Sequence, residues 1–127
     1  MIDHVSIAVR DLAASAKLYE EMLATIGYAR LVARPDTIGF GKAYPEFWLN
    51  HRPAMTELAA ESGVHVCLRA RTPEAVDAFH AAALSGGASC DGPPGLRPEY
   101  SGTYYAAFVR DPDGNRIEAV TFIAGAI

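Results

Sequence analysis

The segment that decides the fold is Tyr104–Val120, which reads YYAAFVRDPDGNRIEAV. Two runs of β-prone residues flank Asp111–Gly114, where Asp, Pro and Gly at the first, second and fourth positions favour a type I turn in a hairpin. The second run carries Glu118 between Ile117 and Ala119. A carboxylate inside an apolar strand needs a hydrogen-bonding partner or a metal ion. Glu118 is therefore the first candidate functional residue.

Length and composition place limits on the class of protein. A chain of 127 residues is long enough for one compact domain with a core of its own. The net charge of −4, with acidic and basic residues mixed throughout, argues against a nucleic-acid surface. No segment has the apolar length of a membrane span or the features of a signal peptide. Cys67 and Cys90 favour reduced thiols of a cytoplasmic protein, with a disulfide between them as the less common alternative.

The first half of the chain predicts one strand, one helix and three further strands. The helix has Asp11 as its cap and Gly27 as its end, because Asp favours the first position and Gly the last. A connector follows, which is compatible with a short helical turn at Met55–Ala60. The predicted ranges are strands at 3–9, 28–33, 37–41 and 46–50, a helix at 11–26, and the connector at 51–62.

The second half repeats this order. Thr72 caps its helix and Pro73 occupies the first helical position, where the missing N–H costs nothing. Gly86 and Gly87 end that helix. The predicted ranges are a strand at 63–70, the helix at 72–85, a strand at 88–90, a Gly/Pro-rich loop at 91–102 that could cover a cavity or be a plain surface loop, and the hairpin at 104–120.

The two halves match in sequence. At an offset of 61 residues His4 falls on His65 and Arg10 on Arg71; near the far ends the offset is 72, which places Glu46 on Glu118. The loop at 91–102 can absorb the difference. Internal repetition at this spacing predicts a single α+β domain, residues 1–127. It consists of two βαβββ modules, about 1–50 and 63–127, that form a curled, mostly antiparallel sheet around a cavity.

Strand alternation predicts which side chains face that cavity. A sheet covered by a helix on one side leaves its other face open. The apolar residues of each first strand belong under the helix, which sends His4 and His65 to the open face. The same alternation puts Glu46 and Trp48 there, whereas the strand of Glu118 alternates less clearly. Two modules set side by side would point these open faces at one cavity.

Two imidazoles and a carboxylate are the ligand set of non-haem Fe(II) sites, and equally of Zn, Mn, Ni or Co sites. Vacant metal positions can hold water or a substrate bound through two oxygens. Each residue alone could be an ordinary hydrogen-bonded rim residue, but their joint occurrence at repeat-related positions favours a divalent-metal site on His4, His65 and Glu118. Glu46 is either a further ligand or general base, or a charge at the edge of its strand.

The chain resembles the vicinal oxygen chelate superfamily, which includes glyoxalase I, extradiol dioxygenases, fosfomycin-resistance enzymes, methylmalonyl-CoA epimerase and bleomycin-resistance proteins. The resemblance covers essentially the whole chain and is carried by His4–Val9, Val64–Val66 and Phe108–Glu118. It implies a metal bound at His4, His65 and Glu118. It also implies chelation of vicinal oxygens of a substrate, with the metal stabilising an enolate or another oxyanion.

Three further residues are candidates for substrate contacts. Tyr104 is a stand-in for the acid–base residues of extradiol dioxygenases, or else an interior aromatic residue. Trp48 could stack on a planar substrate or pack between modules. Arg69 could pair with a carboxylate or phosphate of the substrate, or with an acidic residue of the chain.

Two functions follow from these residues. The leading hypothesis is a small metal-dependent enzyme of the glyoxalase or dioxygenase type. The alternative is a binding protein of the bleomycin-resistance type, which captures an aromatic or antibiotic-like ligand through Trp48 and Tyr104 without turnover. The resemblance also implies that the cavity forms within one chain or between two. We predict a homodimer in which His4 comes from one chain and His65 and Glu118 come from the other.

Overall fold

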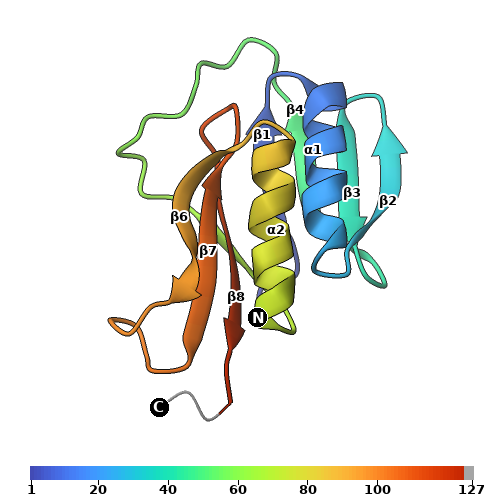
Figure 1. The fold of residues 1–127 in the computed structure, drawn as a ribbon. Coiled ribbons are helices and arrows are strands. Elements are labelled where there is room, and N and C mark those ends of the chain that lie inside the picture. Colours follow the sequence, from blue (N-terminus) through green and yellow to red (C-terminus); the bar gives the residue numbers. More distant parts are fainter. Residues whose placement is uncertain (125–127) are drawn as a thin grey trace.

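The computed structural model describes residues 1–124 and shows the order βαβββ twice (Figure 1). The last three residues of the predicted second module lie outside this range. The elements are β1 (Val5–Val9), α1 (Leu12–Ala24), β2 (Ala29–Arg34), β3 (Thr37–Gly41), β4 (Pro45–His51), β5 (Val66–Arg69), α2 (Pro73–Ser85), β6 (Ser89–Leu96), β7 (Tyr104–Arg110) and β8 (Arg116–Phe122).

Each module forms one four-stranded sheet, and the two sheets have the same topology. The strand orders are β1-β4-β3-β2 and β5-β8-β7-β6. In both sheets the first strand lies parallel to the last, and the other neighbours are antiparallel. The predicted α+β class and the two modules are thus confirmed, and the sheets do not close into a barrel. The exact limits of the modules remain a prediction.

The two helices begin where their cap residues predict. The Asp11 carboxylate accepts a hydrogen bond from Ala14 N, and the Thr72 hydroxyl accepts one from Ala75 N, each at 3.1 Å. These bonds satisfy amides that have no partner inside the helix. The helices pack side by side (Figure 1), and one hydrophobic core extends through both modules. Its largest fully buried side chains include Tyr19, Met22, Leu23, Phe40, Phe47, Leu49, Phe79 and Ile117.

The turn between β7 and β8 has the predicted form. Gly114 N donates to Asp111 O at 3.0 Å, and Gly114 takes a φ of 88°, which is open to glycine. The Asp111 carboxylate folds back over the turn, where its Oδ1 accepts hydrogen bonds from the amides of Asp113 and Asn115. Asp, Pro and Gly therefore act in this turn as the sequence pattern predicts.

The same turn holds the two modules together. Tyr19 on α1 donates its hydroxyl to Asp111 Oδ2 at 2.7 Å, and Arg10 Nε lies 2.6 Å from Asp113 Oδ1. Asn115 Nδ2 donates to Ala8 O at 2.9 Å. All three partners belong to the first module, so the hairpin of the second module is anchored on β1 and α1.

The expected helical turn at Met55–Ala60 is wrong. This stretch contains no helix, and turns occur only at 53–54 and 60–61. Its backbone bonds go to the β7–β8 hairpin instead: Leu58 N donates to Asp113 O, and Arg110 Nη2 donates to Leu58 O. Those tertiary bonds take the place of the bonds that a helical turn would make.

The boundaries of two strands also differ from the prediction. β5 starts at Val66 rather than at Gly63, so His65 precedes the strand. The predicted loop at 91–102 is strand up to Leu96, because β6 pairs with β7 across two register shifts. Pro93 and Pro94 are tolerated there, since β6 is an edge strand with bulges.

Two further findings concern expectations from the composition. None of the helices within residues 1–124 is long and apolar enough to cross a membrane. Cys67 and Cys90 are both free thiols, so the alternative of a disulfide between them is wrong.

Candidate metal site

The candidate site lies on the face of the second sheet that is turned away from α2. Val66, Leu68 and Tyr105 pack toward the core under α2, so their neighbours along each strand point the other way. This confirms the strand phase that the sequence predicts. The side chains on the open face are Cys67, Arg69, Tyr104, Phe108, Glu118 and Phe122, with His65 at the start of β5.

Glu118 lies at the centre of this face and is only 2% exposed. It is buried because β8 has a strand on each side: Cys67 of β5 and Phe108 of β7 are its cross-strand neighbours. Its Oε1 lies 3.0 Å from His65 Nε2, and its Oε2 accepts a hydrogen bond from the Tyr104 hydroxyl. Among residues 1–124 no Lys or Arg nitrogen lies within 4.0 Å of this carboxylate.

Tyr104 is held beside Glu118 by aromatic neighbours. Its ring makes edge-to-face contacts with Tyr100 and Phe122, at centroid distances of 5.0 and 5.4 Å. Burial and the hydrogen bond to Glu118 raise the pKa of the Tyr104 hydroxyl well above its usual range. At neutral pH this residue is therefore a hydrogen-bond donor. Tyr105 points to the other face and donates to Asp77 on α2.

Cys67 fills the space beside Glu118 and Tyr104. Its Sγ lies 4.0 Å from the Tyr104 hydroxyl oxygen. Burial, followed by the charge of Glu118, raises the pKa of the Cys67 thiol to about 12. The thiol stays protonated at neutral pH, so Cys67 lacks the thiolate that a nucleophile requires.

A cavity of about 230 Å³ opens beside His65. It is lined by Gly63, Val64, His65, Asp91, Tyr100, Phe108 and Arg116. Arg69, a predicted substrate contact, lies outside this lining, because its guanidinium stacks on the ring of Phe122 at 4.6 Å. The wall of the cavity beside His65 thus includes two aromatic side chains, Tyr100 and Phe108.

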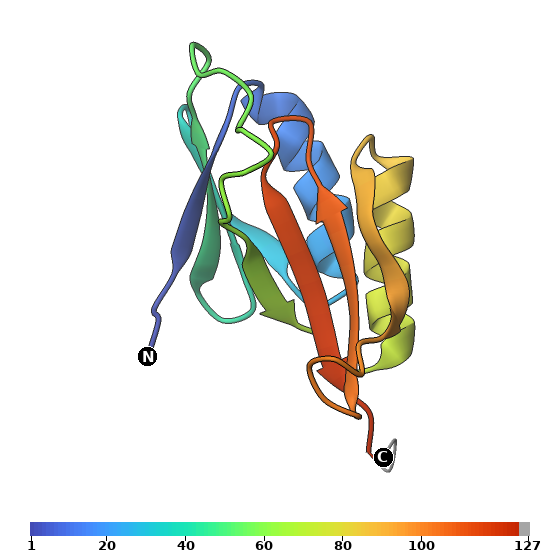
Figure 2. The same cartoon turned by 90° about the vertical axis from the view of Figure 1, so that its left-hand side faces the viewer.

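His4 precedes β1 and lies apart from the other two candidate ligands. Its side chain is 53% exposed, and its Nδ1 lies 2.6 Å from Asp3 Oδ1. Figure 2 shows the N-terminal segment well separated from β8. Within residues 1–124 no three His, Cys, Asp or Glu side chains lie close enough to hold a metal ion. One chain therefore brings together His65 and Glu118, but not His4.

Strand register corrects the predicted relation between Glu46 and Glu118. Trp48 pairs with Ser6 on β1, just as Glu118 pairs with Cys67 on β5, and Ser6 and Cys67 are repeat-related at the offset of 61. Trp48 is therefore the counterpart of Glu118, so the offset is 70 residues there instead of 72. Sequence matching alone could not identify Trp48 and Glu118 as counterparts, because strand pairing decides which positions of the two modules correspond.

Glu46 and Trp48 lie on the first sheet, apart from His65 and Glu118. Glu46 is next to the Tyr28 hydroxyl, and burial together with this carboxylate raises the pKa of Tyr28. Trp48 covers Gly39, where an added Cβ would lie 2.9 Å from the indole ring. The structure thus places the predicted site residues in two groups, one on each sheet.

The chain matches the family model of the Glyoxalase/Bleomycin resistance protein/Dioxygenase superfamily over residues 1–119. The chain belongs to this superfamily. The resemblance noted in the sequence is thus confirmed, and the match includes all seven candidate residues. None of the curated proteins compared with the chain matches it.

Solved structures of this superfamily share the fold. A glyoxalase/bleomycin resistance protein from Albidiferax ferrireducens T118 is 34% identical, with a TM-score of 0.81 over 93% of this chain and 96% of that one. A family enzyme from Burkholderia phytofirmans PsJN is 19% identical, with a TM-score of 0.72 over 96% and 98%. The fosfomycin resistance protein FosX from Listeria monocytogenes is 14% identical, with a TM-score of 0.69 over 99% and 96%. The last two show likeness of fold alone.

Three residues near the candidate site were not predicted from the sequence: Tyr100, Arg97 and Asp3. Tyr100 lies on a turn after β6 and packs on Tyr104, and Arg97 stacks on Phe108 at 5.3 Å. Both belong to the segment 91–102, for which the sequence predicts a possible cover of the cavity but no role for either residue, because the path of a loop decides which side chains reach the site. The role of Asp3 was predictable, because a carboxylate next to His4 can bind the imidazole and fix its orientation.

The donors present fit a divalent metal ion. Two ligands that share a metal, each at about 2.1 Å, lie roughly 3 Å apart, which matches the 3.0 Å between His65 Nε2 and Glu118 Oε1. A buried carboxylate with no Lys or Arg partner among the described residues also favours a cation. Asp3 engages Nδ1 of His4, and within residues 1–124 its Nε2 has no hydrogen-bond partner, an arrangement common among metal-binding histidines.

Proposed function

We propose that this protein is a small metal-dependent enzyme of the glyoxalase/dioxygenase type. The divalent metal is bound by His65 and Glu118 of one chain and by His4 of a second chain in a homodimer. The observation that supports this most directly is the close approach of His65 Nε2 to a buried carboxylate that has no Lys or Arg partner within the described chain. Imidazole and carboxylate donors suit Zn, Fe(II), Mn, Ni or Co.

The side chains around the metal have separate roles. A bound metal supplies Lewis-acid stabilisation of two neighbouring oxygens on a small substrate. Tyr104 holds Glu118 Oε2, which orients the carboxylate and leaves Oε1 beside His65. To act as a proton donor toward the substrate, Tyr104 would turn its single O–H away from Glu118. Tyr100 and Phe108 exclude water from the cavity next to His65 and shape its wall.

Assembly of two chains explains why His4 stands alone. In one chain, the open face of the first sheet presents His4 and Trp48, and the open face of the second presents His65 and Glu118. A dimer that pairs the first module of one chain with the second module of the other brings both sets to one cavity, and the two-fold symmetry yields two such sites. Glu46 has no ligand role in this proposal, since Trp48 occupies the position that corresponds to Glu118.

A second candidate function is ligand binding without turnover. The aromatic side chains on the open face favour a planar ligand, which would stack on Tyr100 or Phe108. In this alternative His65 and Glu118 form a hydrogen-bonded pair rather than a metal site. Trp48 from a second chain would complete the aromatic lining.

Metal analysis separates these two functions. We expect about one equivalent of a transition metal per chain in protein purified without a His-tag, or after reconstitution. The Glu118→Gln variant keeps the shape of the side chain and should bind less than ~0.1 equivalents. Wild-type protein with less than ~0.2 equivalents and no uptake on reconstitution would contradict the enzyme proposal and favour the binding protein. With metal bound, oxygen uptake with catechols and loss of hemithioacetal separate the dioxygenase and glyoxalase classes.

Mixing variants tests the shared site. His4→Gln and Glu118→Gln each destroy both sites of a homodimer, whereas a heterodimer of the two retains one intact site. Refolding an equal mixture should therefore restore about a quarter of the wild-type metal sites. As the matched control, a mixture of Glu118→Gln and His65→Gln should restore none, because both residues come from the same chain. Full metal binding by a monomer would contradict the shared site but leave the metal proposal standing.

A further inference from the structure

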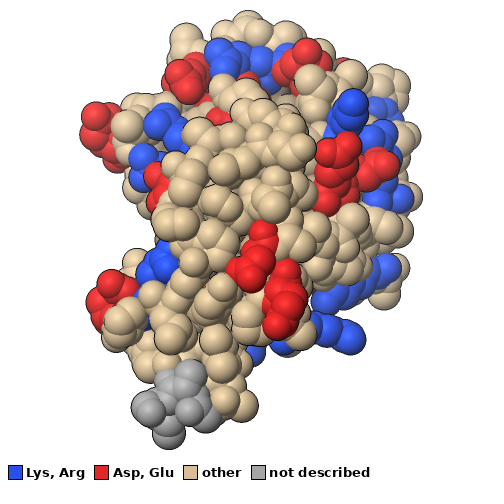
Figure 3. All heavy atoms as spheres, in the orientation of Figure 1, with Lys and Arg blue, Asp and Glu red and all other residues tan. Residues whose placement is uncertain are grey.

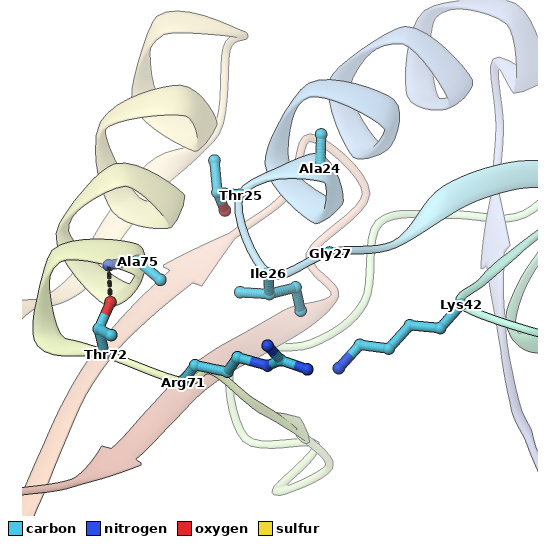
Figure 4. A pocket seen from close by; sticks show the side chains of 8 residues that line it. All are labelled: Ala24, Thr25, Ile26, Gly27, Lys42, Arg71, Thr72 and Ala75. Atoms are coloured by element: carbon cyan, nitrogen blue, oxygen red, sulfur yellow. Dashed lines mark hydrogen bonds between the residues drawn. The ribbon is translucent and has the colours of Figure 1, made fainter.

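A second cavity lies between the modules, on the helix side of the molecule. It has a volume of about 660 Å³ and lies between the end of α1 and the start of α2. Its lining consists of Ala24, Thr25, Ile26, Gly27, Lys42, Arg71, Thr72 and Ala75. Figure 4 shows the long side chains of Lys42 and Arg71 extended toward each other across this cavity.

The two cations face each other without an acidic partner. Within residues 1–124 no carboxylate oxygen lies within 4.0 Å of Lys42 Nζ or of the Arg71 guanidinium. Lys42 has the ring of Tyr28 nearby, at 5.9 Å from the centroid, which tolerates a cation but does not neutralise it. Two like charges that converge repel each other, and an anion between them would turn repulsion into attraction. In Figure 3 basic atoms lie along the lower edge of the molecule on the α1 side.

The repeat supplies a direct comparison. A smaller cavity of about 260 Å³ is lined by Arg10, Asp11, Ala14 and Gly86. At the offset of 61 residues these four correspond to Arg71, Thr72, Ala75 and Thr25 of the larger cavity. The β7–β8 turn adds Asp113 to the smaller cavity, and the β3–β4 turn adds Lys42 to the larger one.

Charge therefore differs at matching places in the two cavities. Arg10 Nε lies 2.6 Å from Asp113 Oδ1, and the Asp113 side chain is only 4% exposed. The side chain of Arg71, its counterpart, points toward Lys42 instead (Figure 4). The smaller cavity carries its own carboxylate, whereas the larger one has two cations and the volume to admit an anion from solution.

The chemistry of the larger cavity favours a phosphate group. Arginine binds two phosphate oxygens at once and lysine binds as a point charge, so the pair suits a dianion. The N-terminus of α2 adds a favourable dipole, part of which Glu74 in the first turn of that helix already offsets. Its Ala75 amide is already bonded to the Thr72 hydroxyl, so this helix contributes its field rather than that N–H.

We propose that the cavity between α1 and α2 binds phosphate, free or as the phosphate group of a small phosphomonoester, between Lys42 and Arg71. This site is separate from the candidate metal site, because α2 covers the opposite face of the second sheet from Glu118. Since Lys42 belongs to the first module and Arg71 to the second, the bound anion bridges the modules.

Lys42 and Arg71 could have a purely structural role instead of binding an anion. α1 carries no basic residue in its last turn, so Lys42 and Arg71 could serve only to offset the negative end of its dipole. The substitution Lys42→Asp separates the two roles. It rebuilds the arrangement of Arg10 and Asp113, which removes the phosphate site and gives Arg71 a partner. If the cations served only α1, an acid at this position would instead destabilise the protein.

The test titrates the full chain with inorganic phosphate and with glycerol phosphate at low salt, by calorimetry and by ³¹P line broadening. We expect saturable binding to the wild type, about tenfold or more weaker in Arg71→Gln and absent in Lys42→Asp, whose melting temperature stays equal or rises. Lys17→Asp, the same change of charge at an exposed position on α1, should bind as the wild type does. Tighter binding of glycerol phosphate than of inorganic phosphate would identify a phosphomonoester as the ligand.

Three outcomes would overturn the phosphate site. The first is no saturable binding to the wild type up to ~20 mM phosphate, a concentration that exceeds weak but specific affinities. The second is an equal loss of binding in Lys17→Asp and Lys42→Asp, which shows attraction to net charge only. The third is a lower melting temperature of Lys42→Asp with phosphate binding retained, which assigns the cations to α1. None of these outcomes affects the metal proposal, because the metal ligands are unchanged in every variant.

Discussion

The two modules of this chain share a backbone and differ in the chemistry of their open faces. Trp48 and Glu118 occupy corresponding positions on the last strands β4 and β8, opposite Ser6 and Cys67. One position thus carries an indole in the first module and a buried carboxylate in the second. The shared topology depends on the apolar residues under the helices, which leaves the open faces free to differ.

The cross-strand neighbours of Trp48 and Glu118 also differ in size: the larger side chain has the smaller neighbour. Trp48 lies over Gly39 on β3, whereas Glu118 lies beside Phe108 on β7. A large ring above a glycine fills the space on the first sheet. On the second sheet the aromatic neighbour stands next to the carboxylate and forms part of the cavity wall beside His65. The repeat thus preserves the position on the last strand of each module but not the side chain that occupies it.

The turns that join the last two strands of each module differ in the same way. The β7–β8 turn is buried and polar, and Asp111, Asp113 and Asn115 all bond to other parts of the chain. The β3–β4 turn is exposed, and its Lys42 faces a cavity. Only one of the two turns therefore anchors the modules to each other, and predictions about stability differ accordingly.

The largest expected effect concerns the two glutamates that the sequence pairs. Glu118→Gln should weaken metal binding about 100-fold or more, because the carboxylate charge at the site is lost. Glu46→Gln should leave metal affinity unchanged, since strand register excludes Glu46 from the corresponding position. Competition with a chromophoric chelator measures both affinities, and the melting temperature of each metal-free variant checks the fold. An equal loss of affinity in the two variants would restore Glu46 as a ligand.

The next effect concerns the buried turn. Tyr19→Phe removes the hydroxyl that donates to Asp111 Oδ2 inside the core. We expect a loss of about 1.5–3 kcal/mol of unfolding free energy at pH 7, as for a hydrogen bond to a charged group. Tyr105→Phe removes a similar bond, to Asp77, at the surface, and should cost less than ~0.5 kcal/mol. Urea unfolding of both variants makes the comparison, and equal losses would show that the turn is not a special anchor.

The cost of Tyr19→Phe should also depend on pH. Burial raises the pKa of Asp111 above its ordinary value, while hydrogen bonds from Asn115 and Tyr19 lower it. The Asp111 carboxyl therefore holds its proton more tightly in the folded protein than in the unfolded chain. As a result, the stability that Asp111 contributes falls as the pH rises from the ordinary pKa of Asp through the raised pKa in the folded protein. Loss of the Tyr19 hydroxyl raises the folded pKa further. The difference between variant and wild type should thus grow from pH 4 to pH 7, and a constant difference would contradict this origin.

The smallest effect concerns the glycine under the indole. An added Cβ at Gly39 would lie 2.9 Å from the Trp48 ring, so Gly39→Ala should displace the ring at a cost of about 1–2 kcal/mol. Trp48 is the single tryptophan of the chain, and its fluorescence reports the movement directly. Gly95→Ala is the control, since its Cβ would meet only the end of the Arg97 side chain at 3.4 Å. An unchanged emission spectrum in Gly39→Ala would show that Trp48 has room to move.

The parts of the fold that depend on neighbours along the chain were predictable. Asp11 and Thr72 cap the two helices, the Asp111–Gly114 turn has its expected bonds, and His65 and Glu118 face away from α2. The misses concern segments whose hydrogen bonds go to distant strands. Met55–Ala60 bonds to the hairpin rather than to itself, and β6 continues through prolines because β7 pairs with it.

The sequence by itself determined the repeat, the helix caps, the turn and the strand phase, because these depend on local preferences and on alternation along a strand. Tertiary structure decided which residues correspond between the modules, since pairing of β1 with β4 and of β5 with β8 sets the register. It also decided that His65 reaches Glu118 while His4 does not. Such distances follow from how two packed modules are oriented, and no local pattern in the chain encodes that orientation.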